Sequence, residues 1–266
     1  MRTNDDVSRG LSAAQIHAFI HEGYVKVDGA FSKDLARTAR EILWRDTGCD
    51  PNDPATWTRP VVRLGMYTGS PFVEAANTPL LHRCFDQLAG AGSWARCGAM
   101  GTFPVRFPSP DDPGDTGWHV DASFGHSDPD FMNWRVNVNS RGRLLLMLFL
   151  FSDVGGHDAP TRIRIGSHCH IARALAPAGE IGMTLGELVA SDFGATSKCP
   201  EASATGEAGT VYLCHPFLVH AAQAHRGTAP RFLAQPPLLP RESDGLTGTV
   251  GKEDTPVQQA IRRALV

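Results

Sequence analysis

The stretch GTVYLCHPFLVHAAQAHRGTAPRFLAQPPLL, residues 209–239, decides the expected fold class. It contains two runs, 209–222 and 231–239, that are rich in the aromatic, β-branched and aliphatic residues typical of strands. Small and polar residues around Gly227 separate the two runs, as expected for a turn or loop. Short strand-like runs joined in this way are typical of antiparallel β-structure.

Further strand-like runs precede this stretch, and the same pattern of short runs separated by turn residues begins at about residue 95. They are residues 101–107, 117–123, 134–139, 144–152 and 162–166, and clusters of Gly, Pro, Asp and Ser separate them. Helical periodicity returns only at 179–193 and 255–266. One β-barrel or jelly roll accounts for this pattern.

Residues 1–95 have a different character, because helical and strand-like patterns alternate there. Helices are expected at 11–22, 32–46 and 78–89, strands at 24–27 and 61–67, and an ordered, Pro-rich loop at 50–60. We therefore expect one domain over residues 1–266. Its fold class is expected to be mainly β with flanking helices, and the helical elements of about residues 1–95 are expected to pack on the barrel.

Composition excludes several classes of protein. Hydrophobic residues make up 42% of the chain and charged residues 20%, which is ordinary for a globular protein. The formal net charge of -3 offers no electrostatic surface for nucleic acid or for an anionic membrane. The six cysteines never occur as C-x-x-C, so they predict neither a zinc site nor a redox site. No apolar run resembles a secretory signal or a membrane span. We expect a cytoplasmic protein that acts on a small molecule.

The first candidate metal ligands lie in the sequence GWHVD at residues 117–121. His119 and Asp121 are two residues apart, and on a strand this spacing directs both side chains to the same face. The third candidate, His220, follows about a hundred residues later. Two histidines and one carboxylate occupy one face of an octahedral iron ion and leave other positions open. His119, Asp121 and His220 are therefore the predicted metal ligands.

An arginine follows the third candidate ligand in the next strand-like run. Arg231 lies eleven residues after His220. A guanidinium group binds a carboxylate through two parallel hydrogen bonds, so Arg231 suits the remote carboxylate of a dicarboxylic co-substrate.

Two other histidines in the same segment compete with His220. His215 also has an arginine eleven residues on, at Arg226. We favour His220 because an apolar run leads directly into it, whereas Arg226 lies in a turn-like sequence. His215 is expected to be a buried, hydrogen-bonded histidine, and His225 a loop residue.

Four motifs occur in the order found in a known family. They are a helix followed by Gly-Tyr-x-x-Val at 19–27, Trp-His-x-Asp at 118–121, Arg-Ile-x-x-Gly-Ser-His at 162–168, and a histidine and arginine at 220 and 231. On these residues the chain resembles the phytanoyl-CoA dioxygenase family of 2-oxoglutarate oxygenases. The resemblance covers nearly all of the sequence.

The resemblance implies a double-stranded β-helix, a cupin-like jelly roll. It also implies an Fe(II)-dependent dioxygenase that uses O2 and the co-substrate 2-oxoglutarate, decarboxylating the co-substrate to succinate while hydroxylating a small organic substrate. By the same resemblance, His119, Asp121 and His220 are the catalytic iron ligands, and Arg231 binds the distal carboxylate of 2-oxoglutarate. Arg106 lies where the family often has a lysine that also contacts the co-substrate.

The chain departs from the family pattern at Ala222, where a serine is common, so one hydrogen bond to the co-substrate is missing or supplied elsewhere. The carboxylate at Asp121 favours hydroxylation over halogenation, because the related halogenases have a small residue there. We interpret residues 166–168 as a turn that closes a strand.

Two other kinds of function stay open. One is a non-catalytic jelly roll that holds a metal or a small ligand, and the other is a different cupin-type metalloenzyme. A structural metal site is expected to be closed by a fourth protein ligand, and cupin-type sites usually lack the distal arginine, so Arg231 favours the oxygenase. Trp118, Trp134, Asn137 and Asn139 are candidates to line the pocket, although packing or solvent exposure accounts for them equally well.

Overall fold

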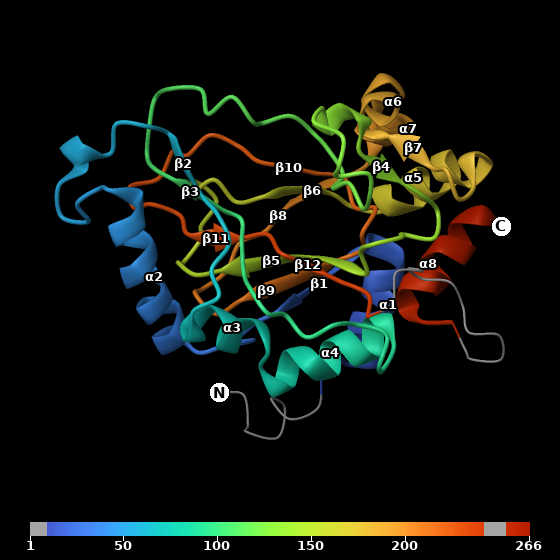
Figure 1. Ribbon diagram of the computed structural model, residues 1–266, viewed down its shortest axis with the longest axis horizontal. Coiled ribbons are helices and arrows are strands. Elements are labelled where there is room, and N and C mark those ends of the chain that lie inside the picture. The colour runs from blue at the N-terminus through green and yellow to red at the C-terminus, as the bar shows by residue number, and fades with distance from the viewer. Residues whose placement is uncertain (1–9, 242–253) are drawn as a thin grey trace.

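The structure is a computed structural model that describes residues 10–241 and 254–266 (Figure 1). Residues 1–9, which carry most of the argument against a secretory signal, lie outside the described residues. Within 10–241 and 254–266, no helix is long and apolar enough to cross a membrane. Antiparallel sheets form the centre of the molecule and helices flank them, so the expected fold class is confirmed.

The larger sheet is built around a central strand of six buried residues, β5 (Leu145–Leu150). Its other strands are β1 (Tyr24–Val27), β9 (Val211–Cys214), β11 (Leu233–Ala234) and β12 (Pro237–Leu238). The order is β1-β9-β5-β11, β12 also pairs with β5, and every pairing is antiparallel. An uninterrupted apolar strand such as β5 indicates a sheet that is covered on both faces.

The smaller sheet lies above the larger one in Figure 1. It contains β10 (His220–Ala221), β6 (Arg162–Arg164) and β8 (Glu201–Ser203), in that order. Two further pairs of strands are β2 (Val61–Leu64) with β3 (Phe103–Arg106), and β4 (Arg135–Val136) with β7 (Met183–Thr184). The smaller sheet carries one of the predicted metal ligands, and β3 carries one of the predicted co-substrate residues.

Alternate side chains of β5 enter two different parts of the core. Leu146 and Leu148 pack with Ile163 of the smaller sheet, between the two sheets. Met147 and Phe149 pack in the cluster that includes the N-terminal helices. Full burial of one such side chain contributes about 1.5 to 3 kcal/mol. The space between the sheets is therefore the interior of the barrel, and the helices cover its outside.

Helices flank the sheets in two groups. The first group is α1 (Ala13–Glu22), α2 (Lys33–Thr47), α3 (Ser70–Ala76) and α4 (Pro79–Ala89). The second group is α5 (Ser167–Leu175), α6 (Leu185–Ala190), α7 (Asp192–Ala195) and α8 (Pro256–Leu265). Figure 1 shows α3 and α4 below the larger sheet, and α8 packs against α1, α4 and α5. Helices α1, α2, α4 and α8 confirm the four helices expected at 11–22, 32–46, 78–89 and 255–266.

The junction between α1 and β1 depends on Gly23. This residue ends α1 in a left-handed conformation, with φ at 89°, which favours glycine. A Cβ atom here would lie 2.5 Å from His168 Nδ1 and 2.8 Å from Leu218 Cδ1. The close approach brings the end of α1 to His168 of α5, whose Nε2 lies 3.1 Å from the Ile20 carbonyl oxygen.

The run 209–222, expected as one strand-like segment, is divided in two. Val211–Cys214 forms β9 in the larger sheet, and His220 begins β10 in the smaller sheet. Between them the Leu218 N–H donates to the His215 carbonyl at 2.9 Å, which closes a four-residue turn with Pro216 in its second position. Proline fixes φ for this turn position and cannot donate to a ladder. Pro216 is thus the physical reason that the chain crosses from one sheet to the other.

Two other expectations for secondary structure are only partly met. Gly166 lies in a turn that closes β6, as expected, but Ser167 and His168 begin α5, a helix of nine residues. The helix expected at 179–193 is only partly present, since β7 precedes α6 and Phe193 has left-handed φ and ψ of 50° and 45°. Thr184 caps α6 through a capping box with Glu187, so the helix begins there rather than at residue 179.

Candidate metal centre

Two backbone segments that are far apart in the sequence bring the histidines together. The His119 N–H donates to the His220 carbonyl at 2.9 Å, and the His220 N–H donates to the His119 carbonyl at 3.0 Å. These reciprocal bonds form an isolated β-bridge, so the strand expected at 117–123 is reduced to one bridge. The two imidazole rings lie 4.3 Å apart between centroids. The bridge alone is enough to place both rings side by side.

Side chains around His119 alternate in direction, as expected for extended backbone. His119 and Asp121 lie together with His220. Trp118 and Val120 belong instead to the apolar cluster that contains residues of α5 and α6. The guanidinium groups of Arg162 and Arg164 both lie over the Trp118 ring, at 4.6 and 4.3 Å from its centroid. This position fits the packing interpretation of Trp118.

The predicted ligand set meets in space. One potential ligand atom from each of His119, Asp121 and His220 lies within 4.8 Å of the others. His119 Nδ1 is 3.0 Å from the Gly117 carbonyl oxygen, and His220 Nδ1 is 3.0 Å from the Leu218 carbonyl oxygen. Because a carbonyl can only accept, both Nδ1 atoms donate a proton and both Nε2 atoms keep a lone pair. Metal-binding histidines commonly have this hydrogen bond on the other ring nitrogen.

Electrostatics favour the protonation states that a metal requires. Burial, together with His119, lowers the pKa of His220 to about 4, so its ring is neutral at neutral pH. Burial raises the pKa of Asp121, but the Arg143 guanidinium and the two histidines outweigh burial and hold that pKa below its ordinary value. The neutral imidazole of His220 and the anionic carboxylate of Asp121 are suitable donors for a divalent cation.

Arg143 is a member of the site that the sequence did not identify. Its Nη1 donates to Asp121 Oδ2 at 2.9 Å. In the sequence, Arg143 belongs to an alternating pattern of arginines and asparagines that is equally typical of a solvated face. Only the fold places it against a predicted metal ligand.

The two predicted co-substrate residues also meet. Arg106 and Arg231 are paired through reciprocal backbone hydrogen bonds of 3.0 and 2.8 Å, and each is only 1% exposed. The Arg106 Nη2 donates to both carboxylate oxygens of Asp115, at 2.7 and 2.8 Å. Arg231 donates to the backbone carbonyls of Ala159 and Pro104 instead of a carboxylate. Thus Arg106 is paired with an acid, which the exposed Arg63 also binds, whereas Arg231 has only carbonyl acceptors among the described residues.

Several N–H groups of this arginine pair have no partner among the described residues. They are Arg106 Nε, Arg106 Nη1 and Arg231 Nε. Burial and the nearby Arg106 lower the pKa of Arg231 to about 9, which shows that its charge is poorly compensated. Buried polar groups are normally satisfied, so these guanidinium N–H groups are donors available to a further acceptor.

His225 lies in a loop, as expected, but it is buried rather than solvent-exposed. Its Nδ1 accepts a hydrogen bond from the Gly227 N–H at 3.1 Å, so the ring proton is on Nε2. This Nε2 has no hydrogen-bond partner within the described part of the chain, although the Ala229 carbonyl favours protonation of the ring. Burial lowers the pKa of His225, and Arg231 and Arg106 lower it further. Spacing in the sequence carries no signal for this burial.

The remaining candidates lie elsewhere. His215 is fully buried, its Nε2 is 3.3 Å from the Val257 carbonyl oxygen, and its ring packs on His168. Asn137 is also buried, but its amide donates to the Glu180 carbonyl at 3.0 Å and so holds a loop. Trp134 packs edge to face with the exposed His126. None of these side chains is in the group formed by the three predicted ligands.

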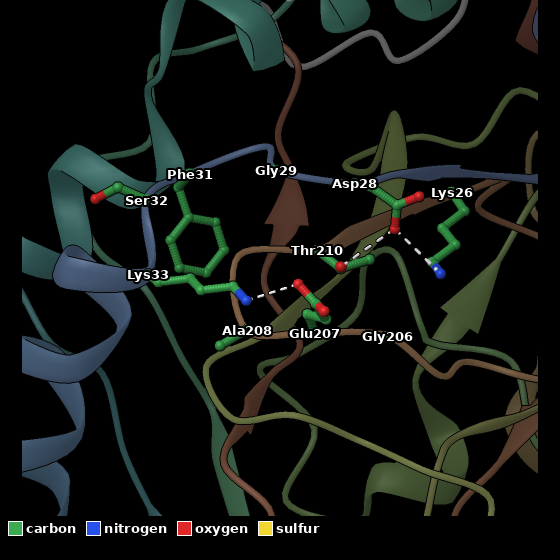
Figure 2. Close-up of a pocket in the computed structure, with 10 residues that line it drawn as sticks. All are labelled: Lys26, Asp28, Gly29, Phe31, Ser32, Lys33, Gly206, Glu207, Ala208 and Thr210. Atoms are coloured by element: carbon green, nitrogen blue, oxygen red, sulfur yellow. Dashed lines mark hydrogen bonds and ion pairs between the residues drawn. The ribbon is translucent and has the colours of Figure 1, made fainter. Parts of the chain in front are cut away.

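A pocket of about 760 Å³ between the start of α2 and the segment before β9 is separate from this centre (Figure 2). Its lysines are paired with acids, Lys26 with Asp28 at 3.1 Å and Lys33 with Glu207 at 2.6 Å. Neither the predicted ligands nor the arginine pair lines this pocket. Its charges are satisfied and solvated, so it gives no indication of a ligand.

Comparison with solved structures gives similar folds. GIG2 (DUF1479), the product of GlcNAc Inducible Gene 2 of Candida albicans, has a TM-score of 0.61 and 14% identity over 89% of this chain. The match spans 65% of the length of GIG2, so this chain corresponds to less than two thirds of that protein. HygX from Streptomyces hygroscopicus, solved with nickel and 2-oxoglutarate bound, has a TM-score of 0.52 and 18% identity over 85% of this chain and 86% of HygX.

A third similar structure is SnoK, a non-heme alpha ketoglutarate dependent carbocyclase from nogalamycin biosynthesis. Its TM-score is 0.50, with 16% identity over 90% of this chain and 89% of SnoK. No protein-family model and no curated protein matches the sequence. The comparisons thus show that this fold is shared with 2-oxoglutarate-dependent enzymes. Membership of the phytanoyl-CoA dioxygenase family stays a prediction.

Proposed function

We propose that residues 1–266 form one Fe(II)- and 2-oxoglutarate-dependent dioxygenase domain that hydroxylates a small organic substrate. The observation that carries the proposal is the meeting of His119, Asp121 and His220 within 4.8 Å. Both imidazoles present Nε2 lone pairs, because their Nδ1 protons are bound to carbonyls. The donor set has the composition of the facial triad of non-haem iron oxygenases.

The number of ligands favours this class over a structural metal site. Within the described residues, the group contains three side chains, whereas a structural zinc site is normally closed by four. Two nitrogen ligands and one carboxylate oxygen leave positions open for a chelating co-substrate. When bound, iron(II) with 2-oxoglutarate and O2 supplies the oxidising chemistry, and 2-oxoglutarate is converted to succinate.

The arginine pair suits the second carboxylate of 2-oxoglutarate. Arg231 would bind the carboxylate that is remote from the metal, with Arg106 beside it. Their buried, unpartnered N–H groups are the kind of site that an anion satisfies. The fold similarity to HygX, which was solved with 2-oxoglutarate bound, supports this assignment. Ala222 supplies no hydroxyl, so the pair would carry most of the binding.

The chain's own residues would position the reactants and limit the access of water. Asp121 would stay ionised, and His220 would stay neutral because it is buried. The apolar side chains between the sheets, such as Leu146 and Leu148, would exclude water from the interior of the barrel. These roles require no ionisable residue beyond the ligands, the arginine pair and the ion-pair partners that hold them.

The direct test is an anaerobic titration of metal-free protein with iron(II) and then with 2-oxoglutarate. We expect a weak visible charge-transfer band that requires both additions, because only bidentate chelation at the iron produces it. A protein that binds iron(II) without forming the band would contradict the co-substrate assignment. Tight binding of another metal and no band would instead support the non-catalytic or cupin-type alternatives.

A further inference from the structure

The two oxygens of Asp121 have different partners. Oδ1 lies 3.8 Å from His220 Nε2, and Oδ2 accepts a hydrogen bond from Arg143 Nη1 at 2.9 Å. The side chains of Arg143 and Asp121 are 12% and 25% exposed, so the pair is mostly screened from water. Charge-assisted hydrogen bonds are roughly twice as strong as neutral ones. One oxygen thus faces the other predicted ligand, while the guanidinium holds the second.

The backbone places Arg143 in this position. Ser140 and Gly142 both have positive φ, at 47° and 86°, in a tight turn before β5. The Arg143 N–H donates to the Ser140 carbonyl at 3.2 Å, and the Ser140 hydroxyl donates to the Arg143 carbonyl. A Cβ atom at Gly142 would clash with the Ser123 carbonyl oxygen, so the turn lies directly against the segment that follows Asp121. Arg143 is therefore held against Asp121 by the turn.

We propose that Arg143 is a positioning residue that restricts Asp121 to coordinating the metal through one oxygen, an inference that rests on the proposed function. Two imidazoles and one oxygen use three of the six positions of an octahedral ion. A 2-oxo acid chelates through two oxygens, which leaves one position open. If Asp121 used both oxygens, chelation would fill the last two positions. Arg143 thereby keeps one position available.

The positive charge of Arg143 also affects the metal ion directly and is expected to weaken its binding. A cation next to the ligand set disfavours a divalent metal ion. Without Arg143, metal binding is therefore expected to be unchanged or tighter, because Asp121 gains a free second oxygen. Chelation by a 2-oxo acid is expected to weaken, because it must displace that oxygen. A residue that only maintained the fold would weaken both kinds of binding together.

The experiment compares wild-type protein with Arg143→Met and with Arg141→Met as the matched control. Arg141 lies in the same turn and is exposed, and its guanidinium lies 5.5 Å from the Phe124 ring centroid instead of on an acid. Cobalt(II) affinity is measured first by calorimetry. The visible band is then titrated anaerobically in the iron(II) proteins, with 2-oxoglutarate and separately with pyruvate. Pyruvate lacks the distal carboxylate, so the arginine pair does not contribute to its binding.

A change beside a metal ligand typically weakens metal binding by about 10- to 100-fold. We expect Arg143→Met to depart from this rule, with cobalt(II) affinity within about threefold of wild type or tighter, because the residue lost is a cation. Chelation of both 2-oxo acids should weaken by about tenfold or more. Arg141→Met should match wild type in every titration. Equal losses of metal and 2-oxo acid binding, or wild-type values for both, would overturn the proposal. If thermal unfolding shows that Arg143→Met does not fold, Arg143→Leu, which also lacks a donor for Asp121, takes its place with the same expectations.

The wild-type titrations separate the two proposals. A wild-type protein that binds no metal, or forms no band with either acid, contradicts the proposed function and this inference with it. A wild-type protein that forms the band, together with an Arg143→Met protein that chelates pyruvate equally well, contradicts the role of Arg143 alone.

Discussion

The metal centre and the arginine pair are built alike but differ in how well their polar groups are satisfied. Each lies at an isolated β-bridge, between His119 and His220 in one case and between Arg106 and Arg231 in the other. The Nδ1 protons of both histidines have carbonyl partners. By contrast, several buried N–H groups of the arginines have none within the described residues.

The metal centre and the arginine pair therefore differ in their effect on the stability of the ligand-free protein. Satisfied imidazoles hold their orientation at little cost, so the metal centre is preorganised. Uncompensated buried charge costs stability, so the arginine pair is the region that an anion would stabilise most. Metal affinity and co-substrate affinity should therefore respond to different substitutions.

The largest expected effect is the loss of a metal ligand. Changes to residues that support a metal ligand typically weaken metal binding by about 10- to 100-fold. We expect a larger loss in His220→Ala, because this substitution removes a predicted metal ligand. His215→Ala is the control, since His215 is buried in the same segment but contacts Val257 and His168. Calorimetry with cobalt(II) measures both. A larger loss in His215→Ala would move the metal centre to that histidine.

The second-largest expected effect is a loss of co-substrate affinity without a loss of metal affinity, which would distinguish the arginine pair from the metal centre. Arg231→Met is expected to weaken 2-oxoglutarate binding by about 2 to 5 kcal/mol, because a buried carboxylate loses its charged partner. Metal affinity should not change. Arg226→Met is the matched control, since Arg226 is exposed and its guanidinium donates to the Ser109 carbonyl at 2.9 Å rather than to an acid. The anaerobic band, titrated with 2-oxoglutarate, gives the co-substrate affinity of each variant, and calorimetry with cobalt(II) gives its metal affinity. An unchanged affinity in Arg231→Met would refute the co-substrate assignment.

The smallest expected effect concerns pH, and above pH 4.5 it should come mainly from buried imidazoles, because the aspartates titrate at lower pH. Burial lowers the pKa values of His220 and His168 to about 4 from 6.5. Between pH 6.5 and 4 the unfolded chain takes up protons that the folded chain does not, so stability falls as pH falls. Each histidine should cost about 2 to 3 kcal/mol by pH 4.5.

Urea unfolding of the metal-free protein at pH 7 and pH 4.5 measures this loss. His220→Asn should lose less stability over the same interval, because its side chain does not titrate. Identical losses in both proteins would show that the burial of His220 does not produce the dependence.

The sequence predicted much of the centre because short-range periodicity carried the information. The spacing of His119 and Asp121 follows from the alternation of extended backbone, and it remains valid although only one bridge forms there. The apolar run before His220 distinguished it from His215. These residues meet as expected, while their roles as ligands stay predictions.

The features that the sequence did not predict depend on contacts across the fold. Arg143 reaches Asp121 only because a turn with two residues at positive φ packs against the segment after Asp121. The burial of His225 and the packing of Trp118 against residues of α5 and α6 likewise depend on neighbours far away in sequence. Pro216 was a local signal for the turn that divides 209–222, but the apolar residues around it favoured a continuous strand.

The bridge between His119 and His220 has a consequence for how the protein folds. It joins segments about a hundred residues apart, so the chain must close a long loop before both imidazoles can meet. Contacts of such long range generally form after local helices and turns. A metal that needs both rings would therefore bind after the barrel has closed and stabilise the folded state. It would slow the opening of the finished molecule rather than hasten its assembly.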